Sequence, residues 1–539
     1  MSLTKQTTSK SDKRDTHEFI ESIPRLTAEI QKLYCQDEIP WVIGVSWGKD
    51  SSCVLQLVWN AIAALPLEKR TKTIYVISTD TLVENPIVSA WVRNSIEKLN
   101  KTAKIKEMPF EAHLLHPEIK NSFWVCLMGK GYPAPRNKFR WCTERMKIQP
   151  ANRFIRQTVR YHSETILVLG TRKAESAKRA ETMKKHEAKR VRDRLSPNGS
   201  LPNSLVYTPI EDWTTNEVWM YLMQWDNPWG GDNKDLFAMY RGATADNECP
   251  MVVDTSTPSC GDSRFGCWVC TMVNKDKSME AMIQNDEEKE WLQPLLDIRN
   301  DLDLRNDRHR RDFRRIHGNV QLFERNVEGE TSIQNIPGPY TKKWREYWLR
   351  KVLEAQVQVR KNAPEEFKDI SLITIEELSE IRRIWLEEKH EFDDSLPRIY
   401  QEVTGEVFQD IRLGVEENKL LGSDEWDVLQ EICDDEMHFE LMSKLLDTER
   451  QYHIQSHRRG IYQSLEKCFH SSSRNKEEAI NKAMQIRELQ TAVSTRNVEE
   501  VKAKVEQLHQ DKFNSKDAKI AESKQLSWGK MKFAKKGEK

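Results

Sequence analysis

The N-terminal half of the chain alternates short apolar runs with longer segments in which apolar residues recur at helical spacing. The short runs are rich in Val and Ile, which favours buried strands, and the longer segments favour helices. Strands that alternate with helices predict the α/β class, with a parallel sheet that binds ligands at the carboxyl ends of its strands. Strands are expected at 41–45, 73–80, 104–108 and 165–170. Helices are expected at about 16–34, 53–64 and 86–101.

The C-terminal half has a different pattern. From about Lys275 onward the sequence is highly charged and predicts mainly helices, with a turn at 335–340. Thr374 and Glu377 form a capping box that begins one helix, as Thr214 and Glu217 do in the first half. Apolar residues at helical spacing between 478 and 510 predict a helix that packs on the protein or on a partner. The expected units are a disordered N-terminus (1–16), an α/β domain (17–280), a charged helical region (281–510) and a lysine-rich tail (511–539).

The charge balance excludes a globally basic or acidic protein, because 84 Lys and Arg face 84 Asp and Glu in 539 residues. Any contact with a polyanion must therefore be local. No apolar run approaches the roughly 18 residues of a membrane span, and residues 1–14 contain no apolar signal core. We therefore expect a cytoplasmic protein with no membrane contact, whose cysteines are mostly reduced.

The first predicted strand ends in the turn S-W-G-K-D-S-S at 46–52, directly before a helix. A helix N-terminus presents free N–H groups and a positive dipole end, and therefore attracts anions. Gly48 lets the backbone approach an anion closely, Lys49 adds a positive charge, and Asp50 can hold a metal ion. The hydroxyl donors are Ser46 and Ser51. The alternative is an ordinary strand–helix turn with a solvated lysine.

Two further strand ends carry polar residues. Asp80 and Thr81 follow the second strand, and the run at 170–179 follows the last one. In that run Arg172 and Arg179 suit phosphate or sulfate oxygens, because guanidinium groups bind oxyanions bidentately. The alternative is a basic amphipathic helix with solvated charges.

Cysteines cluster in one loop, where Cys260, Cys267 and Cys270 lie within eleven positions. A Cys-x-x-Cys pair in a reducing compartment indicates a metal site. Thiolates fit either zinc or a [4Fe–4S] cluster, and the spacing does not separate the two. Cys53 and Cys433 have apolar helical surroundings and are expected in the core.

These motifs together resemble those of PP-loop proteins related to phosphoadenylyl-sulfate reductases, which cleave ATP between the α- and β-phosphates. The loop matches the family pattern S-G-G-K-D-S except at Trp47, where a bulky side chain would narrow the phosphate cradle. The run at 170–179 resembles G-x-R-x-x-E-S-x-x-R, and the segments at 140–150 and 206–219 resemble two further family elements. The resemblance covers about half of the chain, roughly 35–280.

The resemblance implies which residues form the site. It implies Lys49, Asp50 and Arg172 as catalytic residues, with Asp50 holding Mg²⁺. It implies an ATP site formed by Ser46, Gly48, Lys49, Asp50, Ser51, Ser52, Asp80, Thr81, Gly170, Arg172, Glu175 and Arg179. It also implies a [4Fe–4S] cluster bound by Cys142, Cys260, Cys267 and Cys270, with Cys249 as a competitor of Cys142.

Sulfonucleotide reductases carry a nucleophilic cysteine in an E-C-G-[IL]-H segment, and this sequence has no such segment. With its long charged extension, the chain instead resembles the DndC family, the ATP-pyrophosphatase and iron–sulfur component of bacterial DNA phosphorothioation. That resemblance implies DNA, a cysteine desulfurase and other phosphorothioation subunits as partners. The alternatives are a sulfonucleotide reductase, a tRNA-thiolating enzyme, or a DNA-binding scaffold whose ATP site is vestigial.

A dense basic run at 305–315 has two interpretations. It could bind a nucleic-acid backbone, since arginines with interleaved aromatics favour phosphate contacts. Alternatively it is a solvated face, paired with the acids Asp297, Asp301 and Asp303.

Overall fold

The structure is a computed structural model that describes residues 15–494 and, beyond them, 503 and 506. Within 15–494 the description omits 138, 192–193, 200, 244–264, 317, 328–329, 413–420, 434, 454–456 and 473–474. Cys249, Cys260, residues 1–14 and the lysine-rich tail therefore lie outside the described residues. The predictions made for them stay predictions.

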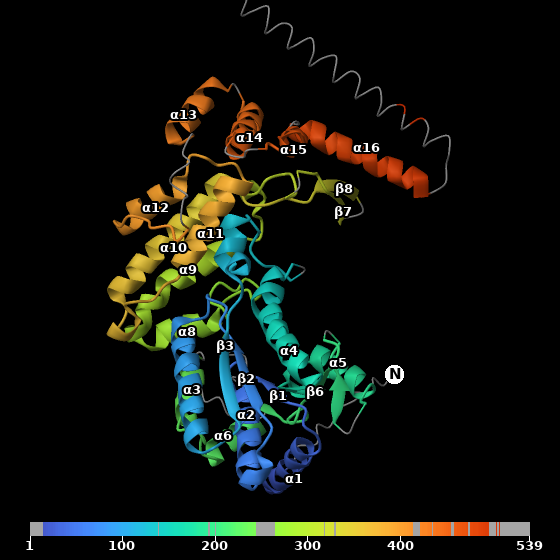
Figure 1. Cartoon of the computed structure of the whole chain (residues 1–539), viewed down its shortest axis with the longest axis vertical. Helices are drawn as coiled ribbons and strands as arrows, with labels where there is room; N and C mark the ends of the chain where they lie inside the picture. Colours follow the sequence, from blue (N-terminus) through green and yellow to red (C-terminus); the bar gives the residue numbers. More distant parts are fainter. Residues whose placement is uncertain are drawn as a thin grey trace, which may run out of the picture.

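The N-terminal part is built on a mixed, mostly parallel sheet, which confirms the α/β class (Figure 1). The strand order is β3-β2-β1-β4-β6-β5, and within the described part of this sheet only the pairing of β5 with β6 is antiparallel. The strands are β1 (Trp41–Gly44), β2 (Ile74–Thr79), β3 (Phe110–Leu115), β4 (Thr165–Leu169), β5 (Leu195–Pro197) and β6 (Ser204–Tyr207).

The strand expected at 104–108 is wrong. Helix α3 (Pro86–Ile105) continues through its first residues, and β3 begins only at Phe110. Leu99 and Ala103 are buried four positions apart, which is helical spacing, whereas Lys104 and its neighbours up to Glu107 are exposed. Residues 104–107 therefore lack the alternation of buried and exposed positions that a strand in the sheet would need.

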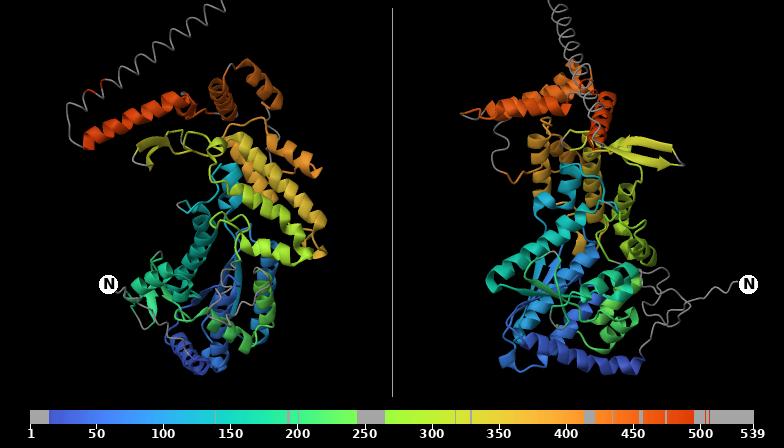
Figure 2. Two further views of the ribbon diagram at one scale, coloured as in Figure 1. Left: turned by 180° about the vertical axis from the view of Figure 1, so that it is seen from behind. Right: turned by 90° about the vertical axis from the view of Figure 1, so that its right-hand side faces the viewer.

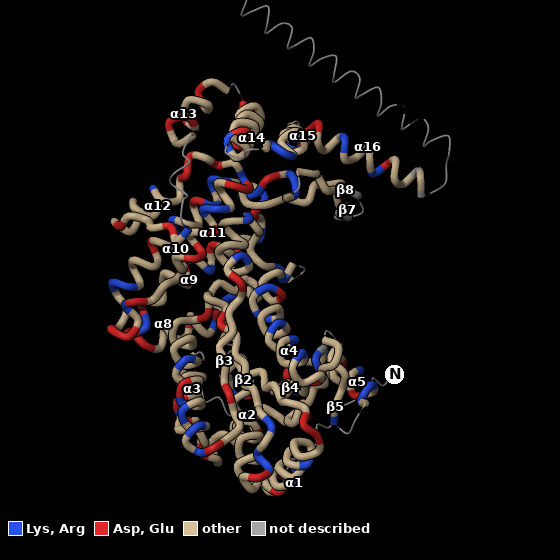
Figure 3. Tube along the Cα trace, viewed as in Figure 1, with Lys and Arg blue, Asp and Glu red and all other residues tan. Residues whose placement is uncertain are grey.

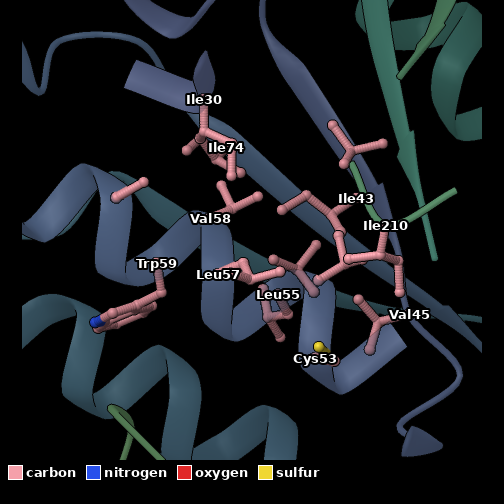
Figure 4. Packing of buried hydrophobic residues seen from close by; sticks show 14 of the residues in the cluster. Ile30, Ile43, Val45, Cys53, Leu55, Leu57, Val58, Trp59, Ile74 and Ile210 are labelled. Carbon is pink, nitrogen blue, oxygen red and sulfur yellow. The ribbon is translucent and has the colours of Figure 1, made fainter. Parts of the chain in front are cut away.

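Alternate residues of each strand face opposite sides of the sheet. On β1, Trp41 and Ile43 join the larger core, whereas Val42 packs in a smaller core with Ile155 of helix α4 (Gln149–His162). Figure 4 shows the larger core from close by, with Ile43 and Ile74 of the strands against Leu57 and Val58. The helices that contribute to the larger core are α1 (Thr16–Cys35), α2 (Lys49–Ala63), α3, α6 (Thr215–Gln224) and α7 (Asn233–Gly242).

A separate helical core joins two parts of the sequence. The segment between β3 and α4 packs on the C-terminal helices: the Trp124 indole donates to Leu372 O at 2.8 Å, and the Trp385 indole donates to Met128 O at 2.9 Å. This insertion of the first half is therefore part of the helical region that lies above the sheet in Figure 1. The helices of this core are α8 (Lys277–Asn285), α9 (Gln293–Leu302), α10 (Lys342–Asn362), α11 (Ile375–Arg383) and α12 (Ser395–Thr404).

The last described helices lie far from the sheet in both views of Figure 2. This half is mainly helical, as expected, but β7 (Leu322–Val327) and β8 (Glu330–Asn335) also form an antiparallel hairpin that the sequence did not suggest. Within the residues described, every helix is too short or too polar to span a lipid bilayer. The last helices are α13 (Ser423–Ile432), α14 (Glu436–His453), α15 (Ile461–Ser472) and α16 (Lys476–Ser494).

Candidate functional site

The turn after β1 forms a hydrogen-bonded loop against the first turn of α2. The sequence predicted that this helix begins near residue 53. Helix α2 in fact begins at Lys49, so Lys49 and Asp50 lie in its first turn. The Ser51 hydroxyl donates to Gly48 O and accepts from the Ser46 N–H, both at 3.2 Å. The first helical donation is from Ser52 N to Gly48 O, so the preceding N–H groups of the helix are free of intrahelical partners. This geometry suits an anion at the helix N-terminus.

Trp47 does not narrow this loop, contrary to the expectation from its size. Its side chain is 2% exposed and packs edge-to-face on Trp229 in the core, with the ring centroids 6.1 Å apart. Its backbone has φ 58°, the left-handed conformation that glycine adopts most easily. Trp47 thus adopts a backbone conformation that a glycine could adopt at this position. Its ring is buried against Trp229 and does not enter the phosphate cradle.

Tyr240 of α7 is a loop contact that the sequence did not suggest. Its hydroxyl accepts from the Lys49 N–H at 3.3 Å, at the N-terminus of α2. The Lys49 ammonium lies over the Tyr240 ring, 5.3 Å from its centroid. Burial raises the pKa of Tyr240, so its hydroxyl keeps its proton at neutral pH. Tyr240 lies almost two hundred positions from the loop in the sequence, so no local pattern could have revealed this contact.

Arg172 is directed at Asp50 and not at open solvent. Its Nε donates to Asp50 Oδ1 at 2.7 Å, and its other nitrogens donate to Trp213 O and the Thr215 hydroxyl. Arg172 is 2% exposed, whereas Asp50 also lies 3.4 Å from the Lys49 ammonium. The structure thus shows Arg172 holding the Asp50 carboxylate in place, and its direct role toward phosphate stays a prediction.

The other predicted residues of 170–179 lie around this contact. Glu175 accepts from the Arg172 N–H at 3.0 Å, which caps the short helical turn before α5 (Ala177–Glu187). Glu175 also forms an ion pair with Arg179. Gly170 lies directly behind the helix N-terminus: a β-carbon there would be 2.8 Å from the Asp50 carbonyl oxygen. Glycine at this position therefore permits the close approach of β4 and α2.

A small cavity of about 80 Å³ opens beside the loop at the carboxyl ends of β1, β2 and β3. Asp80 lies in its wall, where it accepts from the Leu82 N–H at 2.9 Å and pairs with Arg93. The wall also contains Ser46, Glu84, Lys147 and Phe265. The cavity therefore presents hydroxyl, carboxylate and cationic groups at the edge where a parallel sheet binds ligands.

The cysteines lie next to this cavity. The Thr81 hydroxyl lies 2.9 Å from Glu84 Oε1 and 3.2 Å from the Cys267 sulfur, and Lys147 pairs with the same Glu84. Burial, together with the charge of Glu84, raises the pKa of Cys267 to about 12. Thr81 thus contacts the cysteine site, although it was predicted among the ATP-binding residues.

Cys142 lies in a different segment but near the same thiols. Burial raises its pKa, and the charge of Cys270 adds to the effect, as it also does at Cys267. Three of the four predicted ligands, Cys142, Cys267 and Cys270, are therefore neighbours, and Cys260 lies outside the described residues. Among the described residues, no three His, Cys, Asp or Glu side chains are close enough to chelate a single metal ion.

The remaining cysteine expectations have mixed outcomes. Cys53 is fully buried in α2, as expected. Cys433 is not a core residue, because it is half-buried at the end of α13. The sequence around Cys468 suggested no role, yet Cys468 is buried whereas Cys433 is not.

The basic run at 305–315 is satisfied within the protein. Arg310 pairs with Asp301 at 2.9 Å, as the second interpretation expected, and Arg311 pairs with Asp307 at 3.4 Å. Arg314 pairs with Asp312 and with Glu440, and Arg308 donates to Asn335 O. Acids thus neutralise three of the six arginines, and Arg308 and Arg315 are held by backbone carbonyls, so most of the run is engaged within the protein.

Comparison with known proteins defines the class of the N-terminal part. Residues 40–230 match the family model of the phosphoadenosine phosphosulfate reductase domain. This segment is therefore similar to a phosphoadenosine phosphosulfate reductase domain. An uncharacterized protein of Methanocaldococcus jannaschii is 26% identical over 200 residues, which are 37% of this chain and 35% of that protein. The chain therefore spans about a third of the length of this curated relative.

Two solved structures show distant similarity. One is phosphoadenylyl-sulfate reductase from Candida auris, with 14% identity, 40% of this chain and 88% of that chain covered, and a TM-score of 0.25. The other is the U34-tRNA thiolase from Methanococcus maripaludis with its [4Fe–4S] cluster, with 13% identity, 53% and 78% covered, and a TM-score of 0.26.

Proposed function

We propose that the protein is the ATP-dependent sulfurtransferase of DNA backbone phosphorothioation, an ATP pyrophosphatase of the DndC type. The observation that carries this proposal is the position of the cysteines. Glu84 and Lys147 line the cavity beside the Ser46 loop, and Glu84 also accepts from Thr81, whose hydroxyl contacts Cys267. The Ser46 loop and Glu84 therefore line one cavity, and Cys267 lies directly behind Glu84, which supports activation of an oxygen followed by sulfur transfer.

In the first step, a non-bridging oxygen of a DNA phosphodiester attacks the α-phosphorus of ATP. The bond from the α-phosphorus to the bridging oxygen breaks, and pyrophosphate leaves with the electron pair. Lys49, the Ser46 and Ser51 hydroxyls and the N–H groups of α2 would stabilise the charge on the departing pyrophosphate. Asp50, which Arg172 holds in place, would bind Mg²⁺ through its remaining lone pairs.

In the second step, sulfur replaces the activated oxygen. The persulfide of a cysteine desulfurase is reduced by a thiol, which yields hydrosulfide and a disulfide. Hydrosulfide attacks the DNA phosphorus, the bond to the AMP oxygen breaks, and AMP leaves with that oxygen and its electron pair. Adenylation is needed because an unactivated phosphate oxygen is a poor leaving group.

The donor set fits a thiolate-bound cluster. The charge of Cys270 raises the pKa of both Cys142 and Cys267, so these three thiols lie near one another. Such thiolates can bind zinc or an iron–sulfur cluster, and the resemblance favours the cluster. With Cys260 as the fourth ligand, these residues would hold a [4Fe–4S] cluster. Such a cluster supplies iron atoms to which sulfur ligands bind.

The test uses the full chain with ATP, Mg²⁺, a DNA duplex, a cysteine desulfurase and its partner subunits. Lys49→Ala is expected to abolish pyrophosphate release and phosphorothioate formation, because Lys49 is the first residue of α2 and places its charge beside the loop. Lys104→Ala, on an exposed position of α3, serves as the matched control. Phosphorothioate is measured by mass spectrometry of digested DNA. Normal pyrophosphate release from folded Lys49→Ala protein would contradict the loop assignment, and thiolated tRNA without modified DNA would favour the tRNA-thiolating alternative.

A further inference from the structure

Helix α4 carries an unusual local charge. Between Arg136 and His162 the sequence contains eight Lys and Arg against one acidic residue, Glu144, which gives a formal charge of +7 in a chain whose total is zero. The helix itself, QPANRFIRQTVRYH, contains three arginines and no acidic residue. Figure 3 shows the blue segments that follow this helix.

The arginines lie on the face of α4 that the sheet leaves free. Ile155 and Phe154 pack on the sheet in the smaller core. Arg153, Arg156 and Arg160 recur at helical spacing and are exposed. They span about 10 Å along the helix axis, at ~1.5 Å per residue.

Arg136 pairs with Asp303 and Lys147 with Glu84, but part of the charge on α4 itself is uncompensated. Arg153 pairs with Glu118 at 2.6 Å, but Arg156 and Arg160 have no acidic partner among the described residues. In the basic run at 305–315, Arg310, Arg311 and Arg314 are paired with acids, and Arg308 and Arg315 donate to backbone carbonyls. Free guanidinium groups on a straight helix are the arrangement that contacts a phosphodiester backbone.

The basic face leads into the candidate site. Helical turn η4 (Thr143–Ile148) continues directly into α4, so one helical segment connects Cys142, Lys147 and the arginines. Lys147 lines the cavity beside Ser46. A nucleic-acid backbone bound along α4 would therefore extend toward the cavity in which one of its phosphates would be activated.

We propose that the exposed face of α4, formed by Arg153, Arg156 and Arg160, binds the phosphodiester backbone of the DNA duplex that the protein acts on. The choice of DNA over RNA rests on the proposed function, whereas the choice of a polyanionic backbone rests on charge and exposure alone. The contacts are made to phosphates and are therefore independent of base sequence.

The test measures binding of the full chain, without ATP, to a DNA duplex and to an RNA duplex of the same sequence at several salt concentrations. We expect Arg156→Ala/Arg160→Ala to raise the Kd for DNA roughly tenfold at low salt, because two phosphate contacts are lost. The slope of log K against log salt should fall by about 1.8, since each contact contributes ~0.9.

The matched control is Lys101→Ala/Lys104→Ala, which removes the same charge from exposed positions of α3, on the other face of the sheet. An unchanged Kd in this control, with equal thermal stability of both variants, supports a local surface. Equal weakening by both variants, or by neither, overturns the proposal. Binding of RNA but not DNA through α4 overturns the DNA assignment. Since no turnover is needed, a protein that binds DNA through α4 but makes no phosphorothioate would refute only the proposed function.

Discussion

At the scale of single residues, the shape of the loop depends on backbone conformation at residues whose side chains take no part in the chemistry. Trp47 illustrates this, because its left-handed backbone is kept while its ring is buried against Trp229. A left-handed backbone costs a bulky residue about 1–3 kcal/mol, and burial of the indole in the core offsets that cost. The sequence showed a departure from the family pattern at this position, but only the packing shows that the loop is unaffected.

Gly170 gives a prediction at this scale. A β-carbon there would lie 2.8 Å from the Asp50 carbonyl oxygen and 3.1 Å from Ser51 N, so backbone atoms would have to move. Gly170→Ala is therefore expected to displace the N-terminus of α2, lower pyrophosphate release more than tenfold and cost about 1–3 kcal/mol of stability. Gly199→Ala is the matched control, because nothing lies within 4 Å of its β-carbon. Equal activity of the two variants would show that the close approach does not matter.

At the scale of elements, local patterns were predictable and long-range ones were not. The capping boxes of α6 and α11 form as expected, with Thr214 paired to Glu217 and Thr374 to Glu377, because each depends on four consecutive residues. The hairpin of β7 and β8 was missed because its charged residues obscure the two-residue alternation of a strand. The basic run at 305–315 kept two interpretations until its partners, such as Glu440 of α14, were known.

Helix α11 supplies a prediction on pH. Glu377 is fully buried, and burial raises its pKa from 4.5 to about 7. The folded state therefore binds the proton more tightly than the unfolded state. This contribution to stability is complete below pH 4.5, decreases as the pH rises, and is lost above about pH 7.

Glu377→Gln removes the charge and keeps an oxygen that can accept from the Thr374 N–H, as Glu377 does at 3.0 Å. The variant is expected to gain stability relative to the natural protein as the pH rises from 5 to 8, by roughly 3 kcal/mol. Urea unfolding at the two pH values measures this difference. A difference that does not change with pH would show that Glu377 titrates normally.

At the scale of the whole molecule, the cysteines lie where two cores meet. Trp268, next to Cys267, packs with Trp124 in the helical core, while the Thr81 hydroxyl that contacts Cys267 follows β2 of the sheet. The Cys-x-x-Cys spacing was visible in the sequence, but the proximity of Cys142 was expected only from resemblance. Its place is set by the packing of the segment between β3 and α4 on the C-terminal helices, which spans hundreds of positions and has no local pattern.

The last prediction follows from this position. A cluster bound by Cys142, Cys267 and Cys270 would tie the insertion to the loop that follows α7, so ligand loss should reduce both iron content and thermal stability. Each Cys→Ser variant is expected to lose the brown absorbance of anaerobically purified protein. Cys53→Ser serves as the control, because Cys53 is buried in α2 and its loss should affect stability without removing iron. Stoichiometric zinc without iron would refute the cluster, whereas full iron in Cys142→Ser would assign the fourth ligand to another thiol such as Cys249.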